Sequence, residues 1–298
     1  MFKKLLVPLD GSHLAEAVLP AVTVIAGRLG ASVKLLHVLE RNAPAQVHGD
    51  RHLGSVPAAD TYLGEVVARL ARAGLQADWH AHEAAEGDVA RSITSHAAEM
   101  GADLILLATH GAGGVRQMVF GSIAQQVIGY GTTPVFLLHP EAAPPSFRCQ
   151  RFVVPLDGAT EHESSVPVAA DLARTFAAAV DLITVVPYRA NLGGPQAAVG
   201  RLLPSATRAL LDVQELESAQ YLQSIAARLP APGGTSRRVD RGDPVELIVK
   251  HLERVDADLL ILATHAHRGW TAFWSGSVSP ELLARWRRPA LLVRAGEG

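Results

Sequence analysis

The stretch Val7-Pro8-Leu9-Asp10-Gly11 occurs again as Val154-Pro155-Leu156-Asp157-Gly158, 147 residues later in the chain. A second stretch also recurs: residues 102–110 read Ala-Asp-Leu-Ile-Leu-Leu-Ala-Thr-His, and residues 257–265 read Ala-Asp-Leu-Leu-Ile-Leu-Ala-Thr-His, 155 residues later. Matches that keep their order along a chain indicate a duplicated structural unit. The chain of 298 residues therefore contains one unit twice, with about eight extra residues in the middle of the second copy.

Each copy alternates short apolar runs with segments of helical spacing. In the first copy, strands are predicted at residues 5–9, 32–39, 76–83, 102–109 and 134–139, and helices at 13–29, 62–73, 87–100 and 120–128. Apolar strands that alternate with helices are typical of a parallel sheet covered on both faces. The predicted fold class is therefore α/β, with two tandem, doubly wound domains of five parallel strands each.

The boundary between the copies lies in a Pro-rich stretch that starts at Glu141. We predict a first domain at residues 1–141, a linker at 142–150 and a second domain at 151–298. A single α/β barrel would need eight strand–helix units in one continuous series. The two separated blocks of about four units argue against that fold.

Composition excludes several classes of partner. The chain has 27 basic and 29 acidic residues, so no positive field favours nucleic acid or an anionic membrane. It lacks an apolar run of about 18 residues, and its first residues are too polar for a signal peptide. The lone Cys149 cannot form an internal disulfide. We expect a soluble, cytoplasmic protein.

A ligand is expected beyond the carboxyl ends of the strands, where helix N-termini offer unpaired N–H groups. Asp10 ends the first strand there, and its carboxylate could accept a hydrogen bond from a ribose hydroxyl. Alternatively, Asp10 or Ser12 only caps the next helix. After the fourth strand, glycines at 111, 113 and 114 precede Gly121-Ser122, and such a loop can approach an anion closely. Ordinary glycine turns would leave the same pattern.

The spacing of these residues, taken together, favours a ligand-binding loop over ordinary glycine turns. Gly111 is followed after nine residues by Gly121-Ser122, Thr109-His110 stands just ahead, and a strand-end aspartate lies in the same unit. This combination resembles the universal stress protein family over nearly the whole chain, twice. Family members with Gly-x-x-Gly, nine residues and Gly-Ser/Thr bind ATP, and others do not. The resemblance implies an adenine nucleotide alpha-hydrolase-like fold.

By position, the resemblance implies an ATP site in the first domain, with or without Mg²⁺. Adenine, ribose and phosphates would be held by Pro8, Leu9, Asp10, Ser12, Val38, Ala108, His110, Gly111, Gly121, Ser122 and Ile123. The matching positions of the second domain are Pro155, Leu156, Asp157, Val185, Ala263, Ala266, Gly276, Ser277 and Val278.

The two copies depart from the family pattern to different degrees. Ala108 replaces the first glycine in one copy, whereas Ala263 and Ala266 replace both leading glycines in the other. If the Ala266 position needs a positive φ, alanine costs about 1 kcal/mol there. Arg268 could compensate by reaching a phosphate, or it could simply be solvated. Binding in the second domain therefore stays open.

Other polar patterns in the sequence do not predict a catalytic or metal site. His80-x-His82 would place two rings on one face of a strand, but no third ligand follows at a fitting spacing, so no metal site is predicted. No nucleophile elbow or paired carboxylates appear, and no catalytic residue is predicted. Asp88 and Asp243, each after a glycine at a predicted helix start, are interpreted as N-caps.

The leading hypothesis is a non-catalytic, nucleotide-dependent module of a stress response or of signalling. Two alternatives stay open: a slow ATPase, and a nucleotide-free scaffold that dimerises. The expected partner is an adenine nucleotide, without nucleic acid or membrane. The two domains are expected to pair within the chain through their final strands, with a homodimer as a further option.

Overall fold

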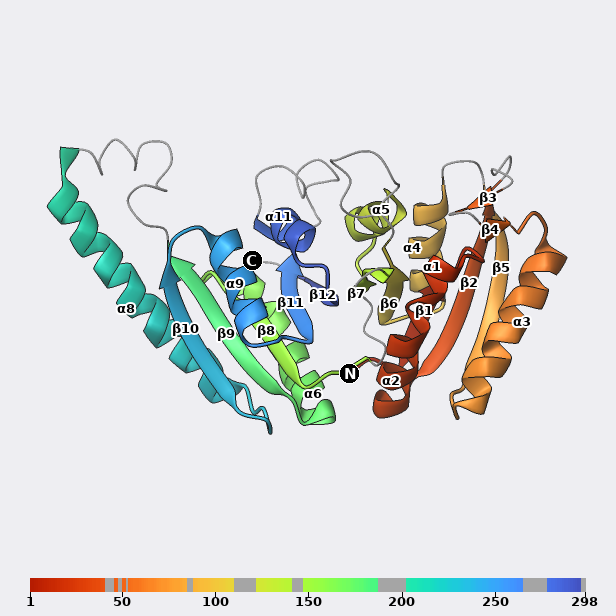
Figure 1. The fold of residues 1–298 in the computed structure, drawn as a ribbon, viewed down its shortest axis with the longest axis horizontal. Helices are drawn as coiled ribbons and strands as arrows, with labels where there is room; N and C mark the ends of the chain where they lie inside the picture. The colour runs from red at the N-terminus through yellow and green to blue at the C-terminus, as the bar shows by residue number, and fades with distance from the viewer. Residues whose placement is uncertain are drawn as a thin grey trace. The chain divides into compact units, whose positions relative to one another are not determined.

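The computed structural model describes residues 1–40, 46–47, 50–51, 53–84, 88–109, 122–140, 147–186, 202–264 and 278–295. They divide into two compact units, one built around Met1–Arg148 and the other around Cys149–Thr264. Each unit contains mostly parallel strands with helices on the faces of the sheet (Figure 1). The predicted α/β class is confirmed. In the described part of the chain, no helix combines the length and the apolar character needed to cross a bilayer.

The first domain contains five parallel strands in the spatial order β7, β6, β1, β2, β5. They are β1 (Lys4–Pro8), β2 (Ser32–Glu40), β5 (Ala77–Ala84), β6 (Leu104–Ala108) and β7 (Val135–Leu138). Along the chain, β2 and β5 are added on one side of β1, and β6 and β7 are then added on the other side. The strand order therefore reverses between β1 and β6.

The compact unit that contains these strands also takes in a segment from the end of the chain, Arg287–Arg294. This segment carries β12 (Ala290–Arg294), which pairs antiparallel with β7 through Ala290 opposite Leu137 and Leu292 opposite Val135. All five residues of β12 except Arg294 are buried.

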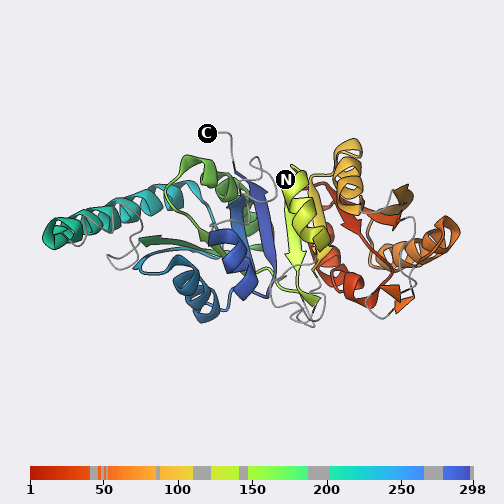
Figure 2. The same cartoon turned by 90° about the horizontal axis from the view of Figure 1, so that it is seen from above.

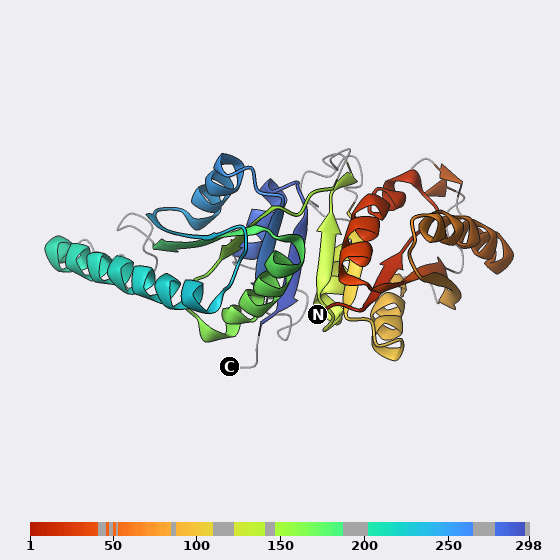
Figure 3. The same cartoon turned by 90° about the horizontal axis from the view of Figure 1, so that it is seen from below.

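The helices of the first domain lie on both faces of its sheet. They are α1 (His13–Glu16), α2 (Leu19–Leu29), α3 (Val56–Arg72), α4 (Val89–Glu99) and α5 (Ser122–Tyr130). The views from above and below place α4 on the opposite side of the sheet from α2 and α3 (Figures 2 and 3). Because crossover helices run back against the strands, their N-termini lie at the carboxyl edge of the sheet.

The second domain repeats this plan. Four of its strands are parallel and lie in the spatial order β10, β9, β8, β11. They are β8 (Arg151–Pro155), β9 (Ala179–Val186), β10 (Thr235–Arg241) and β11 (Leu259–Thr264). Around them lie the 3₁₀ helix η2 (Thr160–Ser164) and the α-helices α6 (Ser165–Phe176), α8 (Pro204–Arg228), α9 (Pro244–Arg254) and α11 (Val278–Arg285). The strand order of this domain again reverses beside its first strand, between β8 and β11.

Two predicted element boundaries in the first domain are wrong. The helix predicted over 13–29 is divided into α1 and α2, with Pro20 in the first turn of α2, where its missing N–H is tolerated. Helix α3 begins at Val56 rather than 62, because the Ser55 side chain accepts a hydrogen bond from the Ala58 N–H and Pro57 follows in the first turn. A short hairpin of β3 (Gln46–Val47) and β4 (Asp50–Arg51) lies between β2 and α3 in the sequence.

Candidate functional site

The tip of β1 is held rigidly by its neighbour β2. The Leu9 N–H donates to the Leu36 carbonyl at 2.8 Å, and the His37 Nδ1–H donates to the Leu9 carbonyl at 2.7 Å. The second domain repeats the arrangement, since the Leu156 N–H donates to Ile183 at 2.9 Å and the Thr184 hydroxyl donates to Leu156 at 2.7 Å. Each domain thus fixes the residue just ahead of its strand-end aspartate.

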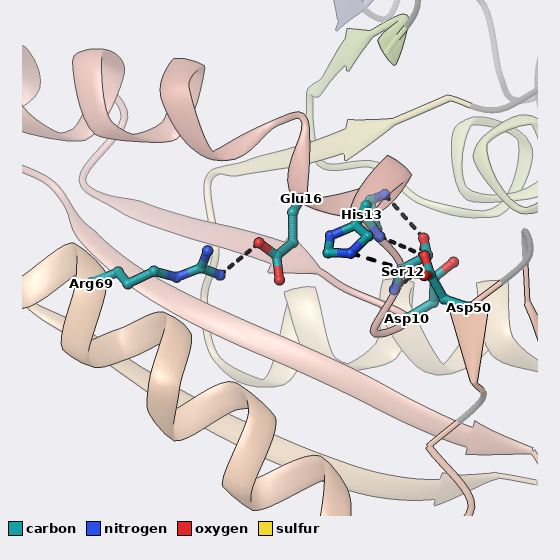
Figure 4. Close-up of polar contacts among 7 residues, drawn as sticks. Asp10, Ser12, His13, Glu16, Asp50 and Arg69 are labelled. Atoms are coloured by element: carbon teal, nitrogen blue, oxygen red, sulfur yellow. Dashed lines mark hydrogen bonds and ion pairs between the residues drawn. The ribbon is translucent and has the colours of Figure 1, made fainter.

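A tight turn follows the tip in the first domain. Gly11 has a φ of +89°, a conformation that other residues rarely adopt. One oxygen of Asp10, Oδ1, accepts hydrogen bonds from the Ser12 N–H at 2.9 Å and the Ser12 hydroxyl at 2.6 Å (Figure 4). The Ser12 oxygen in turn accepts from the Ala15 N–H at 3.1 Å. Ser12, which is fully buried, is therefore the helix cap, and Asp10 is oriented by it.

The hairpin and Leu53, which follows it, lie against this turn. The Asp50 carboxylate accepts a hydrogen bond from the His13 N–H at 2.9 Å (Figure 4). A methyl group added at Gly11 would lie 2.9 Å from the Leu53 side chain. Asp50 and Leu53 thus help to fix the start of α1 next to Asp10.

The other predicted residues of the first domain lie around the same tip where the structure describes them. Val38 is buried near the end of β2, Ala108 ends β6, and Ser122 and Ile123 begin α5. Together with Asp10, they lie at the carboxyl edge, on either side of the point where the strand order reverses. Such a switch point is where open α/β sheets bind ligands. The predicted site residues His110, Gly111 and Gly121 lie outside the described residues.

The second domain has lost the serine cap. Ala159 stands where the first domain has Ser12, and its N–H still donates to Asp157 Oδ1 at 3.0 Å. Without a capping hydroxyl, the following turn is the 3₁₀ helix η2 instead of α1. This turn brings His162 Nδ1 to 2.8 Å from Asp157 Oδ2. In this domain, the strand-end carboxylate is engaged in an ion pair.

The remaining predicted positions of the second domain follow the first. Leu156 is buried, Pro155 and Val185 are half-buried at the ends of β8 and β9, and Ala263 lies near the end of β11. Val278 begins α11 and is 40% exposed. The predicted positions Ala266, Gly276 and Ser277 lie outside the described residues.

The Asp157–His162 pair predicts a specific pH dependence. The hydrogen bond with Asp157 raises the pKa of His162 above its ordinary value of 6.5, so the pair stabilises the fold below that pH and weakens as the pH rises through the folded pKa. Burial tends to raise the pKa of Asp157, but the hydrogen bond from His162 outweighs burial and lowers this pKa. The stability that Asp157 contributes is therefore lost as the pH falls through its folded pKa. NMR titration of the imidazole should show the His162 pKa dropping in Asp157→Asn. An unchanged pKa in that variant would contradict the pairing.

A further polar cluster beside the strand tip was missed in the sequence. Arg69 of α3 contacts the Glu16 carboxylate at 2.6 Å (Figure 4), and burial together with Glu16 raises the pKa of Tyr62. The negative charge of Asp10 raises the pKa of Tyr62 as well, which is consistent with its proximity. The cluster therefore couples the first helices to α3 next to Asp10.

The same cluster recurs in the second domain. Arg228 contacts Glu163 at 2.8 Å, and burial and Glu163 raise the pKa of Tyr221. The signal was present in the sequence, because residues 62–70 and 221–229 both read Tyr-Leu-x-x-Val/Ile-x-Ala-Arg-Leu, 159 residues apart. This offset differs from 147 and 155, so the match is out of register with the other two repeated stretches.

The two N-caps expected at the third crossover helix of each domain differ. The Asp243 carboxylate accepts a hydrogen bond from the Glu246 N–H at 2.8 Å, which confirms its capping role at α9. Asp88 occupies the cap position of α4 without a capping hydrogen bond from its side chain. Its carboxylate instead lies 3.6 Å from the Arg91 guanidinium.

A family model for universal stress proteins matches residues 1–139 and 149–294, which is nearly the whole of both domains. The chain belongs to the universal stress protein family. It contains the family's domain twice in tandem, and this membership supports a role in the stress response.

Individual relatives agree with the family assignment. Universal stress protein YxiE of Bacillus subtilis is 29% identical over 150 residues, covering 46% of this chain and 99% of that protein. Universal stress protein Sll1654 of Synechocystis is 29% identical over 138 residues, covering 46% of this chain and 86% of that protein. Each relative therefore corresponds to one of the two domains.

Solved structures match the fold of the tandem chain. A universal stress protein from Archaeoglobus fulgidus superposes with a TM-score of 0.66 at 16% identity, covering 99% of this chain and 97% of that one. A functionally unknown protein, PA1789 from Pseudomonas aeruginosa, has a TM-score of 0.69 at 15% identity, covering 99% and 93%. At these identities, the likeness concerns the fold alone.

Proposed function

We propose that this universal stress protein binds ATP in its first domain and acts as a non-catalytic, nucleotide-dependent module of the stress response. The site would lie at the carboxyl edge of the sheet, between the tips of β1 and β6. Adenine would rest against Pro8, Leu9 and Val38, the ribose against Asp10 and Ala108, and the phosphates at the N-terminus of α5.

The observation that carries this proposal is the convergence of these residues at one switch point. Asp10 stands there on a turn that Ser12 and Gly11 fix, so its carboxylate presents a positioned acceptor for a ribose hydroxyl. Hydrogen bonds to a charged acceptor contribute about 1.5–3 kcal/mol each. The N-terminus of α5 adds backbone donors and a partial positive charge, both of which favour phosphate.

The second domain is proposed to bind nucleotide more weakly. Its strand-end carboxylate is paired with His162, so a ribose hydroxyl would compete with an imidazole for the same oxygens. The two glycine-to-alanine changes at Ala263 and Ala266 reduce the support for phosphate further. We therefore propose one tightly bound ATP per chain.

The test combines ligand identification with stoichiometry. Freshly purified protein is denatured and the released ligand is identified by mass spectrometry, while apo protein is titrated with ATP by calorimetry. We expect released adenine nucleotide, one high-affinity site per chain, and a stabilisation of about 2.7 kcal/mol when ATP exceeds its Kd a hundredfold. Absence of released nucleotide, together with no thermal shift at millimolar ATP, would instead favour the scaffold hypothesis. Accumulation of ADP during incubation would favour the slow ATPase.

A further inference from the structure

Two histidines lie on one face of the edge strand of the first domain. His80 and His82 alternate with Trp79 along β5, which is the outermost strand on its side of the sheet. The Trp79 Nε1–H donates to Asp60 of α3 at 3.0 Å, so Trp79 lies on the α3 face. Successive side chains point to opposite faces of a strand. The two histidines therefore lie on the face covered by α4 (Figure 2).

A third histidine joins them from α4. His96 is buried, and its ring centroid lies 5.1 Å from that of His80 and 4.6 Å from that of His82. One ligand atom from each of the three residues lies within 4.8 Å of the others. His96 lies 14 positions after His82 in the sequence, and only the crossover from β5 to α4 brings them together.

The hydrogen bond of His96 prepares it to ligate a metal. Its Nδ1 lies 2.8 Å from the Ser92 carbonyl oxygen. Because a carbonyl only accepts, Nδ1 carries the hydrogen, and in the neutral ring Nε2 then holds a lone pair. Metal-ligating histidines usually donate their other N–H to a carbonyl or carboxylate in this way. This bond fixes the tautomer and orientation that a metal requires.

We propose that His80, His82 and His96 bind one divalent transition-metal ion of the Zn²⁺ class. Imidazole nitrogens suit zinc, copper and nickel, and three protein ligands leave a fourth position for water or an outside donor. At Zn–N distances of about 2.0–2.1 Å, tetrahedral ligand atoms lie about 3.3 Å apart, so the three side chains need only a modest contraction. His80 and His82 keep contact with solvent, which gives them room to make it.

A positive charge on the same face of the sheet is already paired. Lys34 lies on the same face of the neighbouring strand, but its ammonium is paired with Asp78 at 2.5 Å. The ion pair offsets the positive charge that would otherwise repel a cation.

The second domain provides an internal comparison. His251 of α9 takes the place of His96, whereas the strand register puts Arg238 and Asp240 where the first domain has His80 and His82. Arg238 and Asp240 form an ion pair. The Arg254 guanidinium lies 2.7 Å from His251 Nδ1, so this nitrogen accepts, and the hydrogen of the neutral ring is on Nε2. A histidine on this helix therefore needs no metal, and the second domain should bind none.

Tag-free, chelator-treated protein tests the proposal by calorimetry with Zn²⁺ and by the visible absorption of bound Co²⁺. We expect one ion per chain and the intense absorption of tetrahedral Co²⁺. Since loss of an outer partner already weakens metal sites about 10- to 100-fold, His80→Asn or His82→Asn should weaken binding at least tenfold, and the double variant should abolish it. Both positions contact solvent, so the fold should persist by circular dichroism.

The matched control is His13→Asn, which removes a histidine whose side chain is 92% exposed and lies outside the cluster. It should leave Zn²⁺ affinity and stoichiometry unchanged. Micromolar binding that survives in the double variant, or no binding at all to the unaltered chain, would overturn the proposal. Neither result depends on whether the protein binds a nucleotide.

Discussion

Asp10→Asn is expected to weaken ATP binding to the first domain about tenfold or more. The asparagine oxygen can still accept the hydrogen bonds from Ser12, so the turn and the cap of α1 should persist. The variant lacks the negative charge that strengthens a hydrogen bond from a ribose hydroxyl, and charged partners contribute about 1.5–3 kcal/mol against about 1 kcal/mol for neutral ones. Titration calorimetry with ATP measures the change directly.

Asp157→Asn is the matched control for this experiment. It makes the same chemical change at the equivalent strand end, where His162 already occupies the carboxylate. Its effect on the tight site should be within about twofold, which is a small fraction of the energy of one hydrogen bond. If both variants weakened ATP binding equally, or if neither did, the proposed placement of the ribose at Asp10 would be wrong.

Gly233→Ala is expected to destabilise the second domain by about 3 kcal/mol, within the range for overpacking a closely packed site. Gly233 lies in the turn before β10, where its N–H donates to the Ala178 carbonyl at 3.1 Å. A methyl group there would clash with the Ala179 nitrogen and would lie 2.5 Å from the Ala178 carbonyl carbon. Both are backbone atoms, so the turn must move away from the start of β9. The midpoint of thermal unfolding should fall by roughly 10 °C.

Gly27→Ala is the control with the opposite expected sign. Gly27 lies within α2, and its added methyl would meet only the Leu75 side chain at an ordinary 3.8 Å. Alanine in a helix is favoured over glycine by about 1 kcal/mol, so this variant should be slightly more stable than the parent. Hydrogen exchange over β9 locates the damage of Gly233→Ala in the second domain. Equal stability of the two variants would contradict the predicted clash.

The duplication made the fold predictable from the sequence. Repeated apolar strands and strand-end aspartates gave the parallel order, and Gly30 and Gly74, both with positive φ, mark helix ends that the sequence predicts. The division of the helix predicted over 13–29 was missed because its apolar spacing continues through Pro20. The apolar spacing shows which face of the helix is buried, whereas the division into α1 and α2 depends on the missing N–H of Pro20.

The candidate site was predictable only in part. Asp10 and Val38 could be placed because a strand end and its neighbour follow from the repeat. The pairing of Asp157 with His162 could not, because it depends on a 3₁₀ turn that forms where Ala159 replaces a serine. The three-histidine cluster was missed for a different reason. His96 is distant from His80 in sequence, and spacing rules describe ligands on one element rather than on two.

The hydrogen bonds that fix the tip of β1 to β2 have a thermodynamic consequence for any ligand that binds there. Both backbone groups of Leu9 are already bonded to β2, so the adjoining acceptor is preorganised before a ligand arrives. Ordering a flexible backbone residue would cost about 1–2 kcal/mol of conformational entropy, and here that loss occurs during folding instead. Affinity differences among strand-tip variants should therefore be dominated by enthalpy, with little contribution from loop ordering.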